Sequence, residues 1–591
     1  MILPPPFVPD SSVLRGVGVG QGLAIGPAHL VSHSKLRYRR YKLSSPEMVE
    51  RELDRLRLAR QKTAELIQAA REALPEELKS HDGIFEAHLL ILHDPYLVNS
   101  TERMITEDRL NAEAAVLAAV RRVVQVMSAI KDGYIKSRLD DTELVGQALV
   151  EAMQEGSGAA DEGEFQEGCV VVCRDISPSE ATKLPAGKVA ALVTELGSQT
   201  SHTSIIVQAM GLPAVVGLPG LLGRIEQGDL LIVDAREGHV IVGPDHDAIK
   251  FYQGRRESEE SFKVEIVRSS HLPAVTLDDH GIDVFGNLEM VDELPAIMSY
   301  GAEGIGLYRT EYLYLTSPVL PTEEQLFEVY SRVVGAAAPR PVIIRTLDLG
   351  ADKILAVSGT PESRQNQALG LRAIRYCLKN IDIFRTQLRA ILRASAFGQV
   401  RIMLPMISSL EEIWRTKKLI EELEGDLKSE GKKVAESIPV GIMVEVPAAV
   451  VLVEELAAEA DFLSIGTNDL IQYSLALDRT NPDVTELYQP FHPSILRMIR
   501  TIVEAGRRQG LSVSVCGDMA ATAQYAPLLV GLGCDMLSMP SSAIPAIKRL
   551  LRMSSFEELS ALSKSVLAAT TSEGSLALID KHLRSRFKEF I

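Results

Sequence analysis

Residues 440–470 of this chain, VGIMVEVPAAVVLVEELAAEADFLSIGTNDL, decide the predicted fold. Two short apolar runs, residues 440–445 and 462–467, flank a segment with helical spacing. Each run leads into a polar side chain, Glu445 at the end of the first and Asp469 just beyond the second. The stretch therefore predicts one strand–helix–strand repeat of an α/β domain, with chemical groups where the strands end.

The same repeat extends over residues 272–591. Eight short apolar runs occur there, mostly separated by helical segments: residues 282–287, 304–309, 342–346, 400–406, 440–445, 462–467, 511–516 and 535–539. Eight β-α units in about 320 residues is the size of a (β/α)8 TIM barrel. A series of unrelated loops would not place polar residues at the ends of so many runs, so a barrel is the predicted architecture.

Polar side chains at the predicted strand ends indicate the chemistry of the barrel, because the active sites of such barrels lie at this face. Arg309, Arg345 and Arg479 stand at strand ends or in the following loops. Guanidinium groups match carboxylate and phosphate oxygens. Glu445 and Asp469 offer two hard oxygen ligands of the kind that hold Mg²⁺. Together these residues predict a site for a small phosphorylated acid.

The cysteines allow two interpretations. Cys516 ends the seventh run beside the predicted site, where a thiol with a shifted pKa can act as an acid or a nucleophile. Alternatively, Cys516 is a buried structural thiol. The arginines also have an alternative, because a single arginine at a strand end is more often part of a surface ion pair. The convergence of three arginines with two carboxylates favours a site. Cys169, Cys173, Cys377 and Cys534 are predicted to be core residues.

The first half of the chain separates into a helical block and a strand-rich part. Ser45 is suited to cap a helix that begins at Pro46, and the block extends to about residue 155. Further helical stretches within it are residues 84–92, 112–130 and 144–153. From residue 169 onward, short strands and turns predict a compact α/β unit, and the polar stretch after residue 245 predicts a linking helix.

A second candidate site lies in the segment Gly197-Ser-Gln-Thr-Ser-His202-Thr-Ser. The small polar neighbours of His202 leave its imidazole accessible, and the residues that follow become apolar and helical. Backbone N–H groups at a helix start favour a phosphate, and a neutral imidazole is a good nucleophile toward phosphorus. A lone histidine is usually structural, but this one is a candidate phospho-acceptor in a different domain from the barrel.

Composition excludes several classes of function. The 591 residues include 62 Lys and Arg against 79 Asp and Glu, a net charge of −17, which argues against a nucleic-acid or anionic-membrane binder and suits a basic protein partner. Residues 196–223 carry no Asp, Glu, Lys or Arg, but their prolines and glycines argue against a membrane span. Five scattered cysteines and a Pro-rich start without a basic segment predict a cytoplasmic protein.

Together the motifs resemble those of Enzyme I of the phosphoenolpyruvate:sugar phosphotransferase system. The resemblance covers nearly the whole chain, and its motifs follow in the same order. They are Phe85-Glu-Ala-His88, Thr200-Ser-His-Thr-Ser204, Leu307-Tyr-Arg-Thr-Glu311, Ile344-Arg-Thr-Leu-Asp348, Leu371-Arg-Ala-Ile-Arg375, Arg389-Ala-Ile-Leu-Arg-Ala-Ser-Ala-Phe-Gly398, Met443-Val-Glu-Val-Pro447, Ser464-Ile-Gly-Thr-Asn-Asp-Leu470, Tyr488-Gln-Pro490 and Cys516-Gly517. Several long motifs in one order are very specific.

This resemblance implies a multidomain α/β architecture. Residues 12–40 and 160–245 would form a swivelling phosphohistidine domain, into which a helical block, residues 45–155, is inserted as the docking site for the phosphocarrier protein HPr. Residues 246–271 would form a linker helix. Residues 272–591 would form the phosphoenolpyruvate-binding TIM barrel, through which the protein dimerises.

The resemblance also implies roles for individual residues. His202 would accept the phosphoryl group from phosphoenolpyruvate as a tele-phosphohistidine and pass it to a histidine of HPr. Cys516 would protonate the departing enolate. The remaining assignments are Arg309, Arg345 and Arg479 as substrate contacts, Asn468 as a phosphate contact, and Glu445 with Asp469 as Mg²⁺ ligands. Arg372 matches another barrel position of the family.

The chain departs from the family at several positions. Ser198 and Gln199 stand where the family usually has glycines and often an arginine, and Gln208 replaces a frequent arginine. Asp518 stands where glutamate is usual after Cys-Gly, and residues 141–144 differ from the usual Asp-Val-Arg-Asp. An active enzyme is still expected, with an altered rate or partner preference.

Three alternatives compete with this interpretation. One is a nitrogen-branch paralogue, which would normally carry an extra N-terminal sensory domain that this length is not expected to allow. Pyruvate phosphate dikinase and phosphoenolpyruvate synthase share the histidine domain and the barrel, but they need a large N-terminal nucleotide-binding domain. Only about 160 residues precede the strand-rich part, and they look helical without a glycine-rich ATP site. A non-catalytic regulatory binder is the alternative of another class, and the retained Arg309, Arg345, Glu445, Asp469 and Cys516 argue against it.

Overall fold

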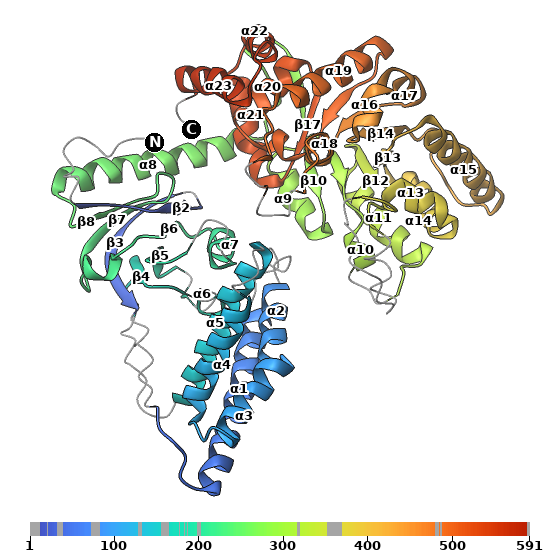
Figure 1. Ribbon diagram of the computed structural model, residues 1–591. Coiled ribbons are helices and arrows are strands. Elements are labelled where there is room, and N and C mark those ends of the chain that lie inside the picture. Colours follow the sequence, from blue (N-terminus) through green and yellow to red (C-terminus); the bar gives the residue numbers. More distant parts are fainter. Residues whose placement is uncertain are drawn as a thin grey trace. The chain divides into compact units, whose positions relative to one another are not determined.

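The computed structural model describes residues 12–20, 22–31, 40–72, 83–127, 133–154, 165–176, 178–181, 184–185, 187–197, 202–315, 319–350, 369–478, 484 and 487–587. The chain divides into two compact units, Met1–Ser261 and Phe262–Ile591. Figure 1 shows both units in the colours of the sequence. The first combines a sheet with a helical block, and the second is a barrel.

Eight parallel strands close into a barrel in the second unit (Figure 1). They are β10 (Gly281–Leu288), β11 (Ile305–Tyr308), β12 (Val342–Arg345), β13 (Val400–Leu404), β14 (Val440–Val444), β15 (Leu463–Ile465), β16 (Val513–Val515) and β17 (Met536–Met539). Each strand pairs with the next along the chain, and β10 pairs with both β17 and β11, which closes the ring. The predicted TIM barrel is confirmed, and each of the eight apolar runs contains one strand.

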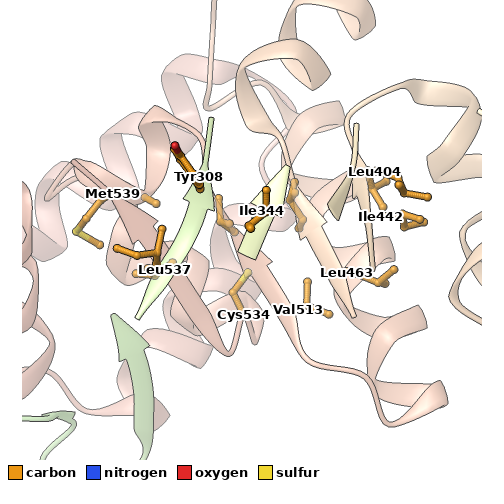
Figure 2. Close-up of a cluster of buried hydrophobic side chains, with 14 of the residues drawn as sticks. Tyr308, Ile344, Leu404, Ile442, Leu463, Val513, Cys534, Leu537 and Met539 are labelled. Carbon is orange, nitrogen blue, oxygen red and sulfur yellow. The ribbon is translucent and has the colours of Figure 1, made fainter. Parts of the chain in front are cut away.

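The strands are mostly apolar because both of their faces are largely buried. One cluster of buried side chains includes Leu307, Ile343 and Met403. Their neighbours Tyr308 and Ile344 belong instead to the large cluster shared with the surrounding helices, part of which is shown in Figure 2. Successive residues of a strand therefore contribute alternately to the two clusters, as the period of two requires.

Helices surround the barrel and follow most of its strands (Figure 1). They are α9 (Leu294–Ser299), α10 (Tyr312–Leu315), α11 (Glu323–Ala337), α13 (Ala373–Lys379), α14 (Ile381–Ala394), α15 (Leu410–Ser429), α16 (Pro447–Val451), α17 (Val453–Glu459), α18 (Thr467–Ser474), α19 (Pro493–Gln509), α20 (Ala526–Leu532), α21 (Ile544–Arg552), α22 (Phe556–Leu567) and α23 (Ser572–Arg586). Local sequence explains several ends. Thr322 and Gln325 form a capping box at the start of α11, and Gly510 ends α19 in a left-handed conformation.

A carboxylate joins the beginning of the barrel to a helix near the end of the chain. Strand β9 (Ala274–Val275) pairs antiparallel with β10, and Asp278 lies in the turn between them. Its side chain accepts hydrogen bonds from Phe556 N (2.8 Å) and Glu557 N (2.9 Å) at the start of α22. Asp278 thus satisfies free N–H groups of a helix that is far away in the sequence.

The first unit contains a mixed eight-stranded sheet (Figure 1). Its strands, in spatial order, are β1 (Val13–Arg15), β8 (His239–Val242), β7 (Leu230–Asp234), β3 (Leu23–Val31), β4 (Cys169–Cys173), β5 (Val189–Thr194), β6 (Ala214–Val216) and β2 (Val17–Val19). Strands β3 to β6 run parallel, and the other pairs are antiparallel. The α/β unit predicted from residue 169 onward thus shares its sheet with strands that precede the helical block.

The helical block lies in the sequence between β3 and β4. Its helices are α1 (Pro46–Glu72), α2 (Gly83–Leu92), α3 (Pro95–Thr106), α4 (Ala112–Met127) and α5 (Gly133–Gln154). As predicted, Ser45 precedes α1, and its Oγ accepts a hydrogen bond from Met48 N at 3.4 Å. The sequence analysis missed α3, which begins with Asp94 as its N-cap and Pro95 in its first turn.

Helix α8 (His246–Arg268) follows the sheet, and the division between the two units falls inside it. Its first half is attached to the sheet, because Arg255 donates to the buried Asp234 of β7 at 2.9 Å and Tyr252 packs against Ile232. Among the described residues, no helix is long and apolar enough to cross a membrane.

Candidate active site

The C-terminal ends of the barrel strands surround a cavity of about 400 Å³, here called the mouth cavity. Its charged lining residues are Glu289, Arg309, Glu311, Arg345, Asp348, Arg372, Glu445, Asp469 and Asp478. Asn468, Gln472 and Cys516 also line it. Opposite charges at this density form a site that can hold an anion and a cation together.

The register of the strands explains why these residues meet. Val444 of β14 lies opposite Ile465 of β15, and Ile465 lies opposite Val515 of β16. Glu445 directly follows β14 and Cys516 directly follows β16, so both leave the sheet at one level. The sequence pattern alone predicted the strand ends, and the register brings them to one side.

Arg345 is the central cation of the mouth cavity. It ends β12, is largely buried, and pairs through its two terminal nitrogens with Glu311 Oε1 and Asp348 Oδ2, each at 3.0 Å. Burial alone would lower the pKa of Arg345, but the two carboxylates outweigh it and raise the pKa. Its Nε is buried and has no hydrogen-bond partner among the described residues. Arg345 is therefore a fixed cation, and its two ion pairs engage only two of its five N–H donors.

Asp348 connects Arg345 to a second arginine. Its Oδ1 accepts hydrogen bonds from Arg372 Nε (3.1 Å) and Nη2 (2.8 Å). Burial disfavours its charge, but Arg345 and Arg372 hold the pKa of Asp348 below its usual value. Arg372 also lies 3.6 Å from Asp469 Oδ2 and donates to the Tyr473 hydroxyl at 3.1 Å. The arginines and acids thus form one continuous network along the wall of the cavity.

Glu445 and Asp469 fit a divalent cation. Glu445 is 1% exposed, and its Oε1 accepts the N–H of Met406 at 2.6 Å. Burial and the neighbouring charges of Asp469 and Asp348 raise the pKa of Glu445 well above its usual range. A cation between the two carboxylates would relieve this repulsion. Among the described residues no cluster of three or more His, Cys, Asp or Glu is suited to a metal, so other ligands would come from substrate and water.

Small residues make room for these carboxylate and hydroxyl groups. A Cβ on Gly466 would lie 2.5 Å from Glu445 Oε2, and one on Gly517 would lie 1.9 Å from Thr467 Oγ1. Asn468 Oδ1 accepts the N–H of Asp518 at 3.1 Å, which ties the loops after β15 and β16 together. Glycine is therefore required at both positions for the loops to approach each other.

Cys516 lies in a mostly apolar environment at the floor of the mouth cavity. It is 3% exposed, and its Sγ accepts a hydrogen bond from Ser464 Oγ at 3.3 Å. Burial raises the pKa of the Cys516 thiol, the Ser464 bond lowers it, and the charge of Glu445 raises it. The net shift is upward. The group is therefore a protonated thiol at neutral pH, which suits a proton donor better than a nucleophile.

Arg309 lies at the more open side of the cavity. It follows β11, and its Nη1 donates to Glu289 Oε1 at 3.0 Å. The Arg309 side chain is 36% exposed, whereas that of Arg345 is 12% exposed. The two arginines thus differ in their surroundings: Arg345 is buried between two carboxylates, and Arg309 has one more exposed partner.

His202 lies in the other unit, at the first residue of α7 (His202–Ala209). Residues 198–201, which include Ser198 and Gln199, are outside the described part of the chain. Gly197, just before them, has a φ of +114°, a conformation that favours glycine. Ser204 and Val207 of α7 face a narrow gap lined also by Thr194 and Gly197. His202 therefore stands at a helix start, as predicted.

Comparison with known proteins assigns the chain to a family. The N-terminal, mobile and PEP-binding domain models of PEP-utilising enzymes match residues 15–138, 165–238 and 263–556. The phosphoenolpyruvate-protein phosphotransferase of Staphylococcus carnosus (strain TM300) is 36% identical over 97% of this chain and 99% of its own. That of Geobacillus stearothermophilus is 36% identical over 96% and 98%. The chain belongs to the phosphoenolpyruvate-protein phosphotransferase family.

The structure brings most of the residues predicted for this phosphotransferase into one place. Arg309, Arg345, Glu445, Asn468, Asp469 and Cys516 all line the mouth cavity. Arg479 lies outside the described residues, although its neighbour Asp478 lines the cavity. Arg372, which the sequence left without a defined role, also lines it. Cys169, Cys173, Cys377 and Cys534 are buried and free, as predicted for core residues.

The sequence analysis missed two acids of the phosphotransferase site. Glu311 ends a motif of the family but received no role, yet it pairs with Arg345 and accepts Asp348 N at 3.0 Å. Glu289 pairs with Arg309. Both follow strands by one to three residues, so the strand-end pattern itself carried the signal. Only the fold shows that each acid faces an arginine.

Proposed function

We propose the following course for the reaction of this phosphoenolpyruvate-protein phosphotransferase. The enzyme is a transferase that binds phosphoenolpyruvate in the mouth cavity. His202 takes the phosphoryl group and then passes it to a histidine of HPr. The observation that carries the proposal is the convergence of Arg309, Arg345, Glu445, Asp469 and Cys516 on one cavity of about 400 Å³.

In this proposal the arginines hold the substrate. Arg345, fixed by Glu311 and Asp348, meets an anionic oxygen without further reorganisation, which is how a preorganised site stabilises charge. Arg309 exchanges its exposed pairing with Glu289 for the ligand. Asn468 contacts the phosphate, and Arg479 is a further substrate contact.

Glu445 and Asp469 would hold Mg²⁺. Their mutual repulsion in a buried site is the feature that supports this assignment. When bound, the ion would neutralise charge on the phosphate and carboxylate oxygens and so help the P–O bond break. The residues of the chain supply the geometry around it.

The chemical steps balance as follows. A ring nitrogen of His202 attacks phosphorus, and the bond between phosphorus and the enol oxygen breaks. The released enolate takes the proton of the Cys516 thiol at its methylene carbon and becomes pyruvate. The thiolate later regains a proton from water. The raised pKa of Cys516, caused mainly by burial, keeps that proton available at neutral pH.

His202 serves two partners in turn, so we propose that residues 12–40 and 160–245 move as a swivelling domain between them. Residues 45–155 dock HPr, residues 246–271 link the modules, and residues 272–591 bind phosphoenolpyruvate and form the homodimer. The acidic balance of the chain suits a carrier with a basic patch. We also propose that the enzyme is cytoplasmic.

Incubation with ³²P-labelled phosphoenolpyruvate and Mg²⁺ tests the acceptor. We expect an acid-labile, base-stable label that moves to added HPr and is absent in His202→Ala. A label that persists in His202→Ala would place the acceptor elsewhere. Binding of phosphoenolpyruvate without any label would favour the non-catalytic regulatory binder.

A further inference from the structure

A buried amide lies directly behind the two strand ends that carry Arg309 and Arg345. Gln387 is in the middle of α14, is 1% exposed, and does not line the mouth cavity. Its Oε1 accepts the N–H of Leu347 at 2.9 Å, and its Nε2 donates to Thr310 Oγ1 at 3.0 Å and to the Tyr330 hydroxyl at 3.3 Å. Thr310 Oγ1 in turn donates to Arg345 O at 3.1 Å.

The direction of these hydrogen bonds is fixed by their two ends. The Leu347 N–H can only donate, so the amide oxygen of Gln387 must face it. The Arg345 carbonyl can only accept, so the Thr310 hydroxyl must donate to it and accept from Gln387. Gln387 and Thr310 can therefore make these hydrogen bonds in only one orientation. An apolar side chain in place of either residue would leave a buried N–H or C=O group without its hydrogen bond.

The hydrogen bonds of Gln387 and Thr310 connect the two segments beyond the last backbone pair of β11 and β12. The last paired residues of β11 and β12 are Tyr308 and Ile344. Beyond that pair, Thr310 reaches the carbonyl of Arg345, and Gln387 holds both Thr310 and the N–H of Leu347. Thr310 is adjacent to Arg309, and Leu347 lies between Arg345 and Asp348 in the sequence. The amide therefore bridges the two arginine-bearing segments.

We propose that Gln387 is a positioning residue for phosphoenolpyruvate binding: its buried amide, acting with the Thr310 hydroxyl, sets the spacing of Arg309 and Arg345 without touching the substrate. The inference rests on the proposed function, because it assigns both arginines to substrate. Side chains that hold binding groups in register affect affinity even though they lie outside the cavity, since small displacements of such groups are costly.

The test measures the dissociation constant of phosphoenolpyruvate with Mg²⁺ by calorimetry, in the full-length chain carrying His202→Ala so that no transfer occurs. Gln387→Met and Thr310→Val each remove one part of the relay with little change of shape. Each is expected to weaken binding by about tenfold or more. Thr310→Ser keeps the hydroxyl and should restore affinity. The double variant should bind no more weakly than the worse single variant, because both changes break one relay.

Tyr330→Phe is the matched control, because it removes the hydroxyl that contacts both Gln387 and Thr310 but leaves Arg345 O and Leu347 N with their partners. It should lower thermal stability without changing the dissociation constant. Affinity within twofold of the parent for both Gln387→Met and Thr310→Val, with stability alone reduced, would overturn the inference and leave the proposed function intact. If the full-length His202→Ala protein did not bind phosphoenolpyruvate, both this inference and the proposed function would be overturned. Should Gln387→Met not fold, the Thr310→Val and Thr310→Ser pair decides alone.

Discussion

The thiol of Cys516 shows how surroundings select a role for a reactive group. The sequence left an acid, a nucleophile and a structural thiol open. Burial and the nearby charge of Glu445 raise its pKa, and the Ser464 hydrogen bond only partly offsets this. A thiol that keeps its proton at neutral pH is a weak nucleophile and an available acid. The environment therefore favours the acid.

Cys516→Ala is expected to bind phosphoenolpyruvate normally but to make pyruvate slowly. Loss of a positioned general acid typically costs about 10²- to 10⁴-fold in rate. Steady-state pyruvate formation with HPr present measures the effect. Cys534→Ala is the control, because Cys534 is an equally buried free thiol that does not line the mouth cavity. Normal turnover in Cys516→Ala would exclude the acid role.

Asp348 is the residue on which the arginine network depends. It is the shared partner of Arg345 and Arg372, and these two cations hold its pKa below the usual value. Asp348→Asn would leave two buried guanidinium groups without their common counter-charge. We expect a loss of about 3 kcal/mol in the unfolding free energy of the barrel, together with weaker phosphoenolpyruvate binding.

Denaturant unfolding and calorimetric titration measure the two effects of Asp348→Asn. Asp382→Asn, an exposed change in the first turn of α14, provides the control. The ion pairs of Asp348 contribute stability above the ordinary pKa of aspartate and lose it as pH falls through the lowered pKa of the folded state. The difference between wild type and variant should therefore shrink in strong acid. A constant difference would contradict the assignment.

At the scale of elements, Asp278, which lies at the start of the barrel sequence, caps α22, which lies near its end. Hydrogen bonds from Thr276, Glu557 and Phe556 hold the pKa of Asp278 far below its usual value. Asp278→Asn should lower the melting temperature of the barrel at pH 7. Because the depressed pKa gives stability that is present above the ordinary value and lost in acid, the difference should decrease below about pH 4.

Calorimetric scans at a series of pH values check the Asp278 prediction. Asp279→Asn is the control, because Asp279 lies next to Asp278 in the same turn. Among the described residues, the hydrogen bonds from Phe556 N and Glu557 N of α22 go to Asp278 and not to Asp279. Equal melting temperatures for wild type and Asp278→Asn at pH 7 would show that the cap contributes nothing.

Much of the element structure was predictable because buried parallel strands have a simple signature. All eight barrel strands appeared as apolar runs, since both of their faces are covered. Helix α3 was missed because its cap, Asp94 followed by Pro95, was not recognised as a start signal. The first sheet was harder: β1 and β2 are only three residues long and pair with strands more than 190 residues away. Such pairings depend on the folded chain rather than on local pattern.

The residues of the candidate site were predictable only where they lie at the end of a predicted strand. Arg309, Arg345, Glu445 and Cys516 could be named because they follow strands. The pairing of Glu311 with Arg345, and the buried Gln387 behind them, could not be named. Both depend on which way a side chain faces and on a helix from another part of the chain, and a strand pattern contains neither kind of information.

At the scale of the whole molecule, the division into two units predicts two unfolding steps. In full-length His202→Ala, phosphoenolpyruvate with Mg²⁺ should raise the melting temperature of the barrel step and leave the other step unchanged, because ligand stabilises only the unit that binds it. At one hundred times the dissociation constant the gain is about 2.7 kcal/mol. Differential scanning calorimetry measures both steps. A single unfolding step would mean that the two units unfold together, and a shift of the other step alone would place the substrate site outside the barrel.

The helical block between β3 and β4 has a further consequence. Parallel neighbours cannot be joined by a tight turn and always require a long crossover. Here β3 and β4 are parallel, with Ala28 opposite Val170, and the described part of the crossover between them contains five helices. An obligatory connection has thus become a second module between two paired strands. On the proposed role of this block in docking HPr, grafting the block of a relative between β3 and β4 should exchange carrier preference and leave the chemistry of the barrel intact.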